Sequence, residues 1–194
     1  MEFFLDNFNW MVVNVGLALL GVLFCNLFLR SRSVFLKAIF FILWVLFVPN
    51  TIYLITDIQH LPKQFSESDV LFKSFLAIQY LTLILLGVIT YIASVYPIEV
   101  FFDKDKKNRQ YTNLFIFLFN FLIAFAVALG KIQRTHSWYI FEDPKRVFND
   151  FYASSSSNLI MLFVIVFGLV LNVLYFTVIR SFKNELRKFF KSWT

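Results

Sequence analysis

The chain has 194 residues, of which 59% are hydrophobic and only 15% are charged. Soluble domains have about 45–50% apolar and about 25% charged residues, and here the apolar residues form unbroken runs, so a soluble globular domain is excluded. The net charge is +6, but the basic residues flank the apolar runs and form no stripe among exposed aromatic residues, which argues against nucleic acid as a partner. The single cysteine, Cys25, excludes an internal disulfide and a cysteine-rich metal site.

Five apolar segments are long enough to cross a bilayer, at about residues 10–29, 38–56, 72–96, 111–130 and 159–179. The acidic residues Glu2 and Asp6 stand where a signal peptide would carry basic residues, so the first segment is kept as a span. We therefore predict an all-α fold, a polytopic membrane helical bundle with one membrane domain over residues 1–180. Residues 181–194 are predicted to be a basic amphipathic cytoplasmic tail that anchors on anionic lipid.

The second span should kink at Pro49, which cannot donate a hydrogen bond to the carbonyl of Val45, and should end at Leu61 and Pro62. After the proline, polar residues share one face of the helix within an arc of roughly 80°, and they are Asn50, Tyr53, Asp57 and His60. A polar side chain at membrane depth normally faces other protein or a water-filled cavity. We expect this polar stripe to be a functional surface.

Each member of the stripe also has a structural interpretation. Asn50 can satisfy backbone groups that the kink leaves open, Asp57 can be a solvated carboxylate at a helix end, and His60 can lie at the headgroup level. Gln79, on the third span, reaches a depth similar to that of Asn50, so the two amides are expected to meet. Glu99, at the end of that span, is expected to be a surface carboxylate among the lysines that follow.

The segment between the fourth and fifth spans should contain a short helix that lies on the outer membrane interface. Asp143 is its expected N-cap and Pro144 its first residue. Its apolar side chains then gather on one face, and they are Val147, Phe148, Phe151 and Tyr152. Polar residues also occur inside the two flanking spans, at Asn113, Asn120, Asn172 and Tyr175.

The distribution of Lys and Arg predicts the orientation. With the N-terminus outside and the C-terminus in the cytoplasm, the cytoplasmic segments carry twice as many basic residues as the outer ones. The expected location is therefore the cell membrane, with several crossings. This orientation places the polar stripe and Gln79 at the outer face, together with the segment that follows the fourth span.

That segment contains Arg134, Ser137 and Trp138. A guanidinium, a hydroxyl and an interfacial indole suit a phosphate or carboxylate at the membrane surface, although Arg134 can also pair with Asp57 to hold two spans together. The two histidines, His60 and His136, match no closed ligand set with Asp57, so we expect no metal and no cofactor. A Ser-His-Asp triad with Ser137 lacks a GxSxG elbow.

The runs FVPNTIYLITDIQH and GKIQRTHSW together resemble an uncharacterised family of bacterial multi-spanning proteins, domain of unknown function 1361. The family pattern has a Pro-Asn pair, a Tyr, an Asp, and an Arg before a Ser-Trp pair, matched by Pro49, Asn50, Tyr53, Asp57, Arg134, Ser137 and Trp138. The family tends to have Asn before the Ser-Trp pair and Asp after it, where this chain has His136 and Tyr139. The resemblance implies an integral membrane protein and supplies no activity.

Two function classes remain open. The first is a non-enzymatic binding, transport or accessory subunit with an outward-facing polar pocket, which would contact membrane lipid and either a partner subunit or further copies of itself. The second is an enzyme that acts on a lipid or lipid-linked headgroup at the outer leaflet, with Asp57 and a histidine as acid and base and Arg134 holding phosphate. Five spans without an internal repeat argue against a self-contained transporter built from inverted repeats.

Overall fold

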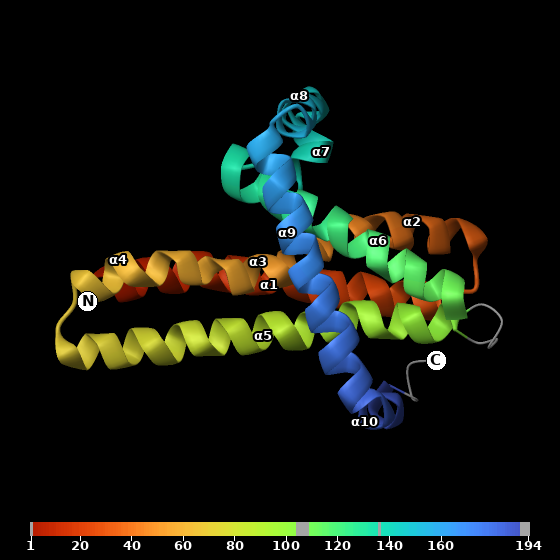
Figure 1. Ribbon diagram of the computed structural model, residues 1–194, viewed down its shortest axis with the longest axis horizontal. Coiled ribbons are helices and arrows are strands. Elements are labelled where there is room, and N and C mark those ends of the chain that lie inside the picture. The colour runs from red at the N-terminus through yellow and green to blue at the C-terminus, as the bar shows by residue number, and fades with distance from the viewer. Residues whose placement is uncertain (1, 104–108, 136, 191–194) are drawn as a thin grey trace. The chain divides into compact units, whose positions relative to one another are not determined.

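The computed structural model describes residues 2–103, 109–135 and 137–190, and its elements in these ranges are all helical (Figure 1). The expected all-α class is therefore confirmed. Five helical segments have the length and hydropathy to cross a membrane, which also confirms the expected number, and they are Phe8–Arg30, Val34–Ser66, Val70–Phe102, Arg109–Gln133 and Asn158–Val178. His136, the lysines at positions 104, 106 and 107, and the last residues of the basic tail lie outside the described residues.

The chain divides into two compact units, Met1–Val95 and Tyr96–Thr194. Unit 1 contains α1 (Glu2–Arg30), α2 (Val34–Phe47), α3 (Pro49–Thr56), the 3-10 turn η1 (Asp57–His60), α4 (Leu61–Ser66) and most of α5 (Val70–Phe102). Unit 2 contains the end of α5, α6 (Arg109–Ala128), the π-helical turn η3 (Leu129–Gln133), α7 (Tyr139–Glu142), α8 (Pro144–Ser155), α9 (Asn158–Leu174), the π-helical turn η4 (Tyr175–Ile179) and α10 (Arg180–Phe190).

The second span breaks where the sequence predicts it, at Val48, between α2 and α3. The side chains of the residues after Pro49 supply hydrogen bonds to the last carbonyls of α2. Asn50 Nδ2 donates to the Phe47 carbonyl at 3.0 Å, and Thr51 Oγ1 donates to the Val48 carbonyl at 2.7 Å. Asn50 therefore has the structural role that proline breaks require.

The same span does not end at Leu61 and Pro62, and that expectation is wrong. The chain tightens into the 3-10 turn η1 and then begins the new helix α4, in whose first turn Pro62 lies. At this position a backbone N–H has no partner within the helix, so a proline loses nothing there. The run of helical residues therefore continues to Ser66.

The core of unit 1 joins α1, α3 and α5 through a cluster of buried residues, which are Met11, Ala18, Leu54, Leu76, Tyr80 and Leu83. Trp44 of α2 is fully buried, and its Nε1 donates to the Ser94 carbonyl of α5 at 3.0 Å. Gly87 lets α5 approach α3 closely, because a Cβ at this position would lie 2.9 Å from the carbonyl oxygen of Thr51.

The core of unit 2 lies between α6 and α9, whose facing buried residues include Ile116, Ile123, Val127, Val164 and Leu171. Gly168 of α9 makes room for the ring of Phe121 on α6. Many other large apolar side chains on these helices are exposed, as Leu118 and Val173 are at 57% and 63%. This exposure fits helices that contact lipid, where apolar surface needs no protein cover.

The predicted short helix is present as α8, and Asp143 caps it as expected by accepting a hydrogen bond from the Arg146 N–H at 3.1 Å. Phe148 and Tyr152 are exposed at 74% and 75%, whereas the ring of Phe151 packs against that of Phe125, so the apolar face of α8 is only partly covered in unit 2. Its place on a membrane interface stays a prediction. The basic tail is helical through Phe190, whose ring lies 5.8 Å from that of Tyr96.

Candidate functional site

The polar stripe of unit 1 contains one deeply buried carboxylate. Asp57 opens the turn η1 and is only 1% exposed. Its Oδ2 accepts a hydrogen bond from Nδ2 of Asn14, on α1, at 3.0 Å. The interpretation of Asp57 as a solvated carboxylate is therefore wrong, because helix α1 covers it. Burying an ionisable group in an apolar segment costs free energy, because the group loses its contact with water. Such a group is therefore a candidate for function.

His60 lies at the other end of the same turn and is exposed. Its ring packs edge-on against Trp10 of α1, with ring centroids 5.9 Å apart. Asn14 and Trp10 are about one turn apart on α1, so one face of this helix contacts both Asp57 and His60. The 3-10 geometry explains why the stripe is unevenly buried, since it rotates successive residues by more than an α-helix does.

A phenol and an amide lie near the same carboxylate. Tyr80 of α5 is 1% exposed, and its hydroxyl donates to Oε1 of Gln64, on α4, at 3.1 Å. The charge of Asp57 interacts with the Tyr80 phenol. The Asp57 cluster, defined as Asn14, Asp57, Gln64 and Tyr80, therefore gathers side chains from α1, η1, α4 and α5. The Asp57 carboxylate only accepts hydrogen bonds, whereas the two amides and the phenol can both donate and accept.

The other stripe residues have different surroundings. Asn50 and Tyr53 are half-buried on α3, and the Nδ2 of Asn50 donates to the Phe47 carbonyl at the end of α2. Gln79 forms no hydrogen bond with Asn50 among the described residues, so the expected meeting of the two amides is not observed. Its Oε1 atom is buried and has no hydrogen-bond partner in the part of the chain that the structure describes.

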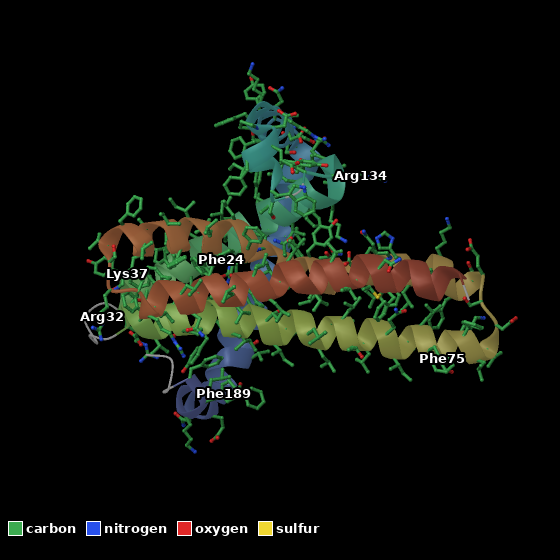
Figure 2. The ribbon with its side chains drawn as sticks, turned by 180° about the vertical axis from the view of Figure 1, so that it is seen from behind. Phe24, Arg32, Lys37, Phe75, Arg134 and Phe189 are labelled. Carbon is green, nitrogen blue, oxygen red and sulfur yellow. The ribbon has the colours of Figure 1, made fainter. Side chains whose placement is uncertain are left out.

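Arg134, Ser137 and Trp138 belong to unit 2. Arg134, labelled in Figure 2, is exposed and follows η3. Its backbone is in the left-handed conformation, with φ 54° and ψ 37°. A non-glycine residue loses about 1 kcal/mol or more in this region, so the backbone alone would favour glycine or asparagine here. Ser137 and Trp138 are half-buried. A shared role of these residues with the Asp57 cluster stays a prediction.

Hydrogen bonds and ring contacts tie the Arg134 segment to α8. The hydroxyl of Thr135 donates to Oδ2 of Asp150, which also lies 3.8 Å from the guanidinium of Arg146. The Arg146 guanidinium stacks over the Tyr139 ring at 4.5 Å. The backbone that follows Arg134 is thus tied to α8.

Sequence reasoning missed several buried polar contacts. Glu99 is only 8% exposed and accepts a hydrogen bond from the Tyr175 hydroxyl at 2.6 Å, so its expected surface position is wrong. Asn120 donates to Asn172 at 3.0 Å and joins α6 to α9. Asn14 was also missed, although a lone amide inside an apolar span is a signal that could have found it.

Among the residues with described positions, no group of three or more His, Cys, Asp or Glu side chains could hold a metal ion. A family model described as "Protein of unknown function (DUF1361)" matches residues 13–174. This range includes Asn14, the polar stripe, Gln79 and the Arg134 segment. No curated protein and no solved structure matches the chain.

Proposed function

The chain belongs to this family of proteins of unknown function, and we propose that it is a non-enzymatic membrane protein that binds a polar ligand at the Asp57 cluster. One observation carries the proposal, namely the burial of the Asp57 carboxylate to 1% exposure against the amide of Asn14. The cluster is built from several helices of unit 1, which is the arrangement of ligand sites in helical bundles.

The chemistry of the cluster indicates which ligand it would take. A carboxylate in a desolvated site binds ammonium groups and hydroxyl donors more strongly than it does in water. The half-buried Tyr53 and Asn50 of α3 and the exposed His60 are further polar groups of the same span. The ligand class is therefore a polar molecule or headgroup that presents an amine or hydroxyl donor.

The predicted orientation and partners belong to this proposal. Figure 2 shows Arg32 and Lys37 at one end of unit 1 and Phe75 near the other end. Under the positive-inside rule the basic end faces the cytoplasm, so the N-terminus and the turn between α4 and α5 face outward. Membrane lipid surrounds the spans, and a partner subunit or a second copy of the chain completes the assembly.

The test compares lipids and small molecules that co-purify with full-length wild-type protein, Asp57→Asn and Asp69→Asn in nanodiscs, identified by mass spectrometry. Asn is isosteric with Asp and can still accept from Asn14, so the fold should persist while the charge is lost. Asp69 is an exposed carboxylate of unit 1 and provides the matched control. We expect an amine- or hydroxyl-bearing species to be retained by wild type and Asp69→Asn and depleted about tenfold in Asp57→Asn.

If all three proteins retain the same amount of the co-purified species and have equal melting temperatures, the Asp57 cluster is not the binding site. Asp57→Glu, which restores the charge, should recover part of the binding. Chemical turnover of an added headgroup by wild type but not by Asp57→Asn would instead support the enzyme alternative. A wild-type protein that retains only bulk membrane lipid would contradict the proposal directly.

A further inference from the structure

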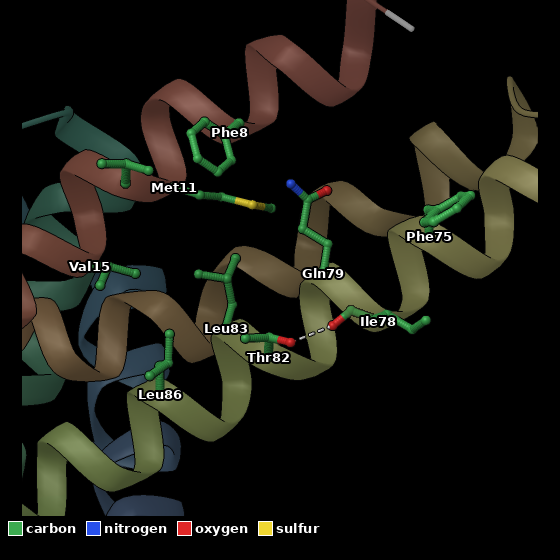
Figure 3. A pocket seen from close by; sticks show the side chains of 10 residues that line it. Phe8, Met11, Val15, Phe75, Ile78, Gln79, Thr82, Leu83 and Leu86 are labelled. Carbon is green, nitrogen blue, oxygen red and sulfur yellow. Dashed lines mark hydrogen bonds between the residues drawn. The ribbon is translucent and has the colours of Figure 1, made fainter.

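Unit 1 presents two different surfaces to lipid. The first is a pocket of about 450 Å³ between α1 and α5, where Figure 3 shows Met11 and Val15 of α1 and Leu83 and Leu86 of α5. None of the described residues that line it is charged. Apolar contact is non-directional, so these walls do not select one lipid headgroup over another. The second surface lies where α1 turns into α2, and it is charged.

The connection between α1 and α2 is short and well anchored. It consists of residues 31–33. The Ser31 N–H donates to the Leu27 carbonyl at 2.9 Å, so the chain keeps a helical hydrogen bond as it leaves α1. One turn from this point, the ring of Phe28 on α1 packs against that of Phe41 on α2, with centroids 5.6 Å apart. The two helix ends are therefore held together, and the side chains that they carry share one surface.

Three basic residues lie on this surface, which we call the α1–α2 turn (residues 30–37). Arg30 ends α1, Arg32 lies in the connection and Lys37 lies near the start of α2. Arg30 and Arg32 are exposed, and Figure 2 shows Arg32 and Lys37 at the same end of unit 1. Neither arginine forms an ion pair with a residue that the structure describes.

No carboxylate of the same hairpin balances these charges. The sequence has no acidic residue between Asp6 and Asp57, so the α1–α2 turn carries positive charge alone. The other acidic residues of unit 1 are Glu2, Glu67 and Asp69. Figure 1 shows the N-terminus and the turn between α4 and α5 at the opposite end of unit 1. Like charges on one turn repel each other, and a bound anion would remove that repulsion.

Large apolar side chains flank the basic residues. Val34 and Phe35, the first two residues of α2, are exposed at 83% and 73%. A water-soluble anion gains nothing from such a surface. A phospholipid presents a phosphate directly above its acyl chains, so it matches both the charges and the apolar side chains.

We propose that the α1–α2 turn binds the phosphate of an anionic phospholipid through Arg30 and Arg32, while Val34 and Phe35 contact its acyl chains. A guanidinium donates paired hydrogen bonds that match the geometry of a phosphate. A headgroup with its own ammonium would add a further positive charge to the turn, so the preferred lipid carries none, as in phosphatidylglycerol. This inference goes beyond the proposed function and does not depend on it.

The test is native mass spectrometry of the full-length protein in detergent micelles, with equal amounts of phosphatidylglycerol and phosphatidylcholine that have identical acyl chains. We expect wild type to bind phosphatidylglycerol about tenfold more tightly than phosphatidylcholine. Arg30→Gln/Arg32→Gln should lose this preference. Lys63→Gln/Lys73→Gln removes the same charge from the opposite end of unit 1 and should bind as wild type does.

Further variants separate charge, apolar contact and the proposed function. Arg30→Lys/Arg32→Lys keeps the charge and should retain most of the preference. Phe35→Ser should weaken the binding of both lipids about threefold, because an apolar contact is lost. Glycerophosphoglycerol, the headgroup without acyl chains, should not displace the lipid at an equal concentration. Asp57→Asn should bind phosphatidylglycerol normally, so a failure of the proposed function would be distinguished from a failure of this site.

Four results would overturn the proposal. The first is equal binding of the two lipids by wild type, and the second is an unchanged preference in Arg30→Gln/Arg32→Gln. The third is an equal loss in both double variants, which would show that net charge alone attracts the lipid. The fourth is displacement by glycerophosphoglycerol, which would show a site for soluble anions. An acidic protein that co-purifies with wild type and is lost from Arg30→Gln/Arg32→Gln would also overturn it, because a protein would then occupy the α1–α2 turn.

Discussion

Polar side chains pair between helices in both units, and the case that differs lies in unit 1. In unit 2 they join helices in pairs, Asn120 with Asn172 and Tyr175 with Glu99. In unit 1 Asn14 and Asp57 form such a pair, but Gln79 keeps an unpaired oxygen beside a pocket. The presence of a polar residue in a span therefore does not reveal its role. The partner of its side chain does, and three experiments can test whether this distinction is energetic as well as geometric.

The largest effect is expected for Tyr175→Phe. It removes the hydroxyl that donates to the buried Glu99 carboxylate, and hydrogen bonds to charged groups contribute about 1.5–3 kcal/mol. We expect the free energy of unfolding, measured by titration with sodium dodecyl sulfate in mixed micelles, to fall by about 2 kcal/mol. Tyr111→Phe, at a tyrosine that is 73% exposed, is the control and should change little. Equal losses in the free energy of unfolding for the two variants would show that the hydrogen bond between Tyr175 and Glu99 does not stabilise unit 2.

A smaller effect is expected for the asparagine pair between α6 and α9. Interhelical hydrogen bonds in membrane proteins contribute about 0.6 kcal/mol on average and up to about 1.7 kcal/mol. A double-mutant cycle of Asn120→Leu and Asn172→Leu should therefore give a coupling free energy of about 1 kcal/mol. Asn172→Leu alone should cost more than Asn120→Leu, because Asn172 also donates to the carbonyls of Phe117 and Gly168. If the free-energy changes of the two single substitutions add up to that of the double substitution, the Asn120–Asn172 hydrogen bond does not stabilise the packing of α6 on α9.

The smallest effect, with the opposite sign, is expected for Gln79→Leu in the absence of a ligand. It removes a buried unpaired acceptor, so the free energy of unfolding should stay constant or rise by up to about 1 kcal/mol. Gln64→Leu is the matched control, since Gln64 accepts from the Tyr80 hydroxyl and its loss should destabilise unit 1 by about 1 kcal/mol. A clear loss of stability in Gln79→Leu would show that its oxygen is already satisfied, and the contrast between the units would disappear.

The elements could be predicted from the sequence because their causes are local. Long apolar runs specify the five spans, Pro49 specifies the break at Val48, and Asp143 with Pro144 specifies the start of α8. The helix end expected at Pro62 failed for a local reason too. A proline ends a helix when it lies in the helix interior, but Pro62 lies in the first turn of α4, where a proline is tolerated.

The pairs could not be predicted because their causes are tertiary. Asp57 and Asn14 are 43 positions apart, and Glu99 and Tyr175 are 76 apart. The sequence shows that each of these residues lies in or beside an apolar span, but the packing of helices chooses its partner. The expected contact between Asn50 and Gln79 is not observed for the same reason. A similar depth in the membrane does not determine the direction in which each side chain points from its helix.

The left-handed backbone at Arg134 has a consequence for how variants of this chain are read. Arg134→Gly would relieve an unfavourable φ but raise the conformational entropy of the unfolded chain, so two opposite contributions to folding offset each other while the guanidinium is lost. A screen that scores only expression level or melting temperature would therefore pass such a variant as neutral. A defect at this position would become visible only in an assay of what the protein does.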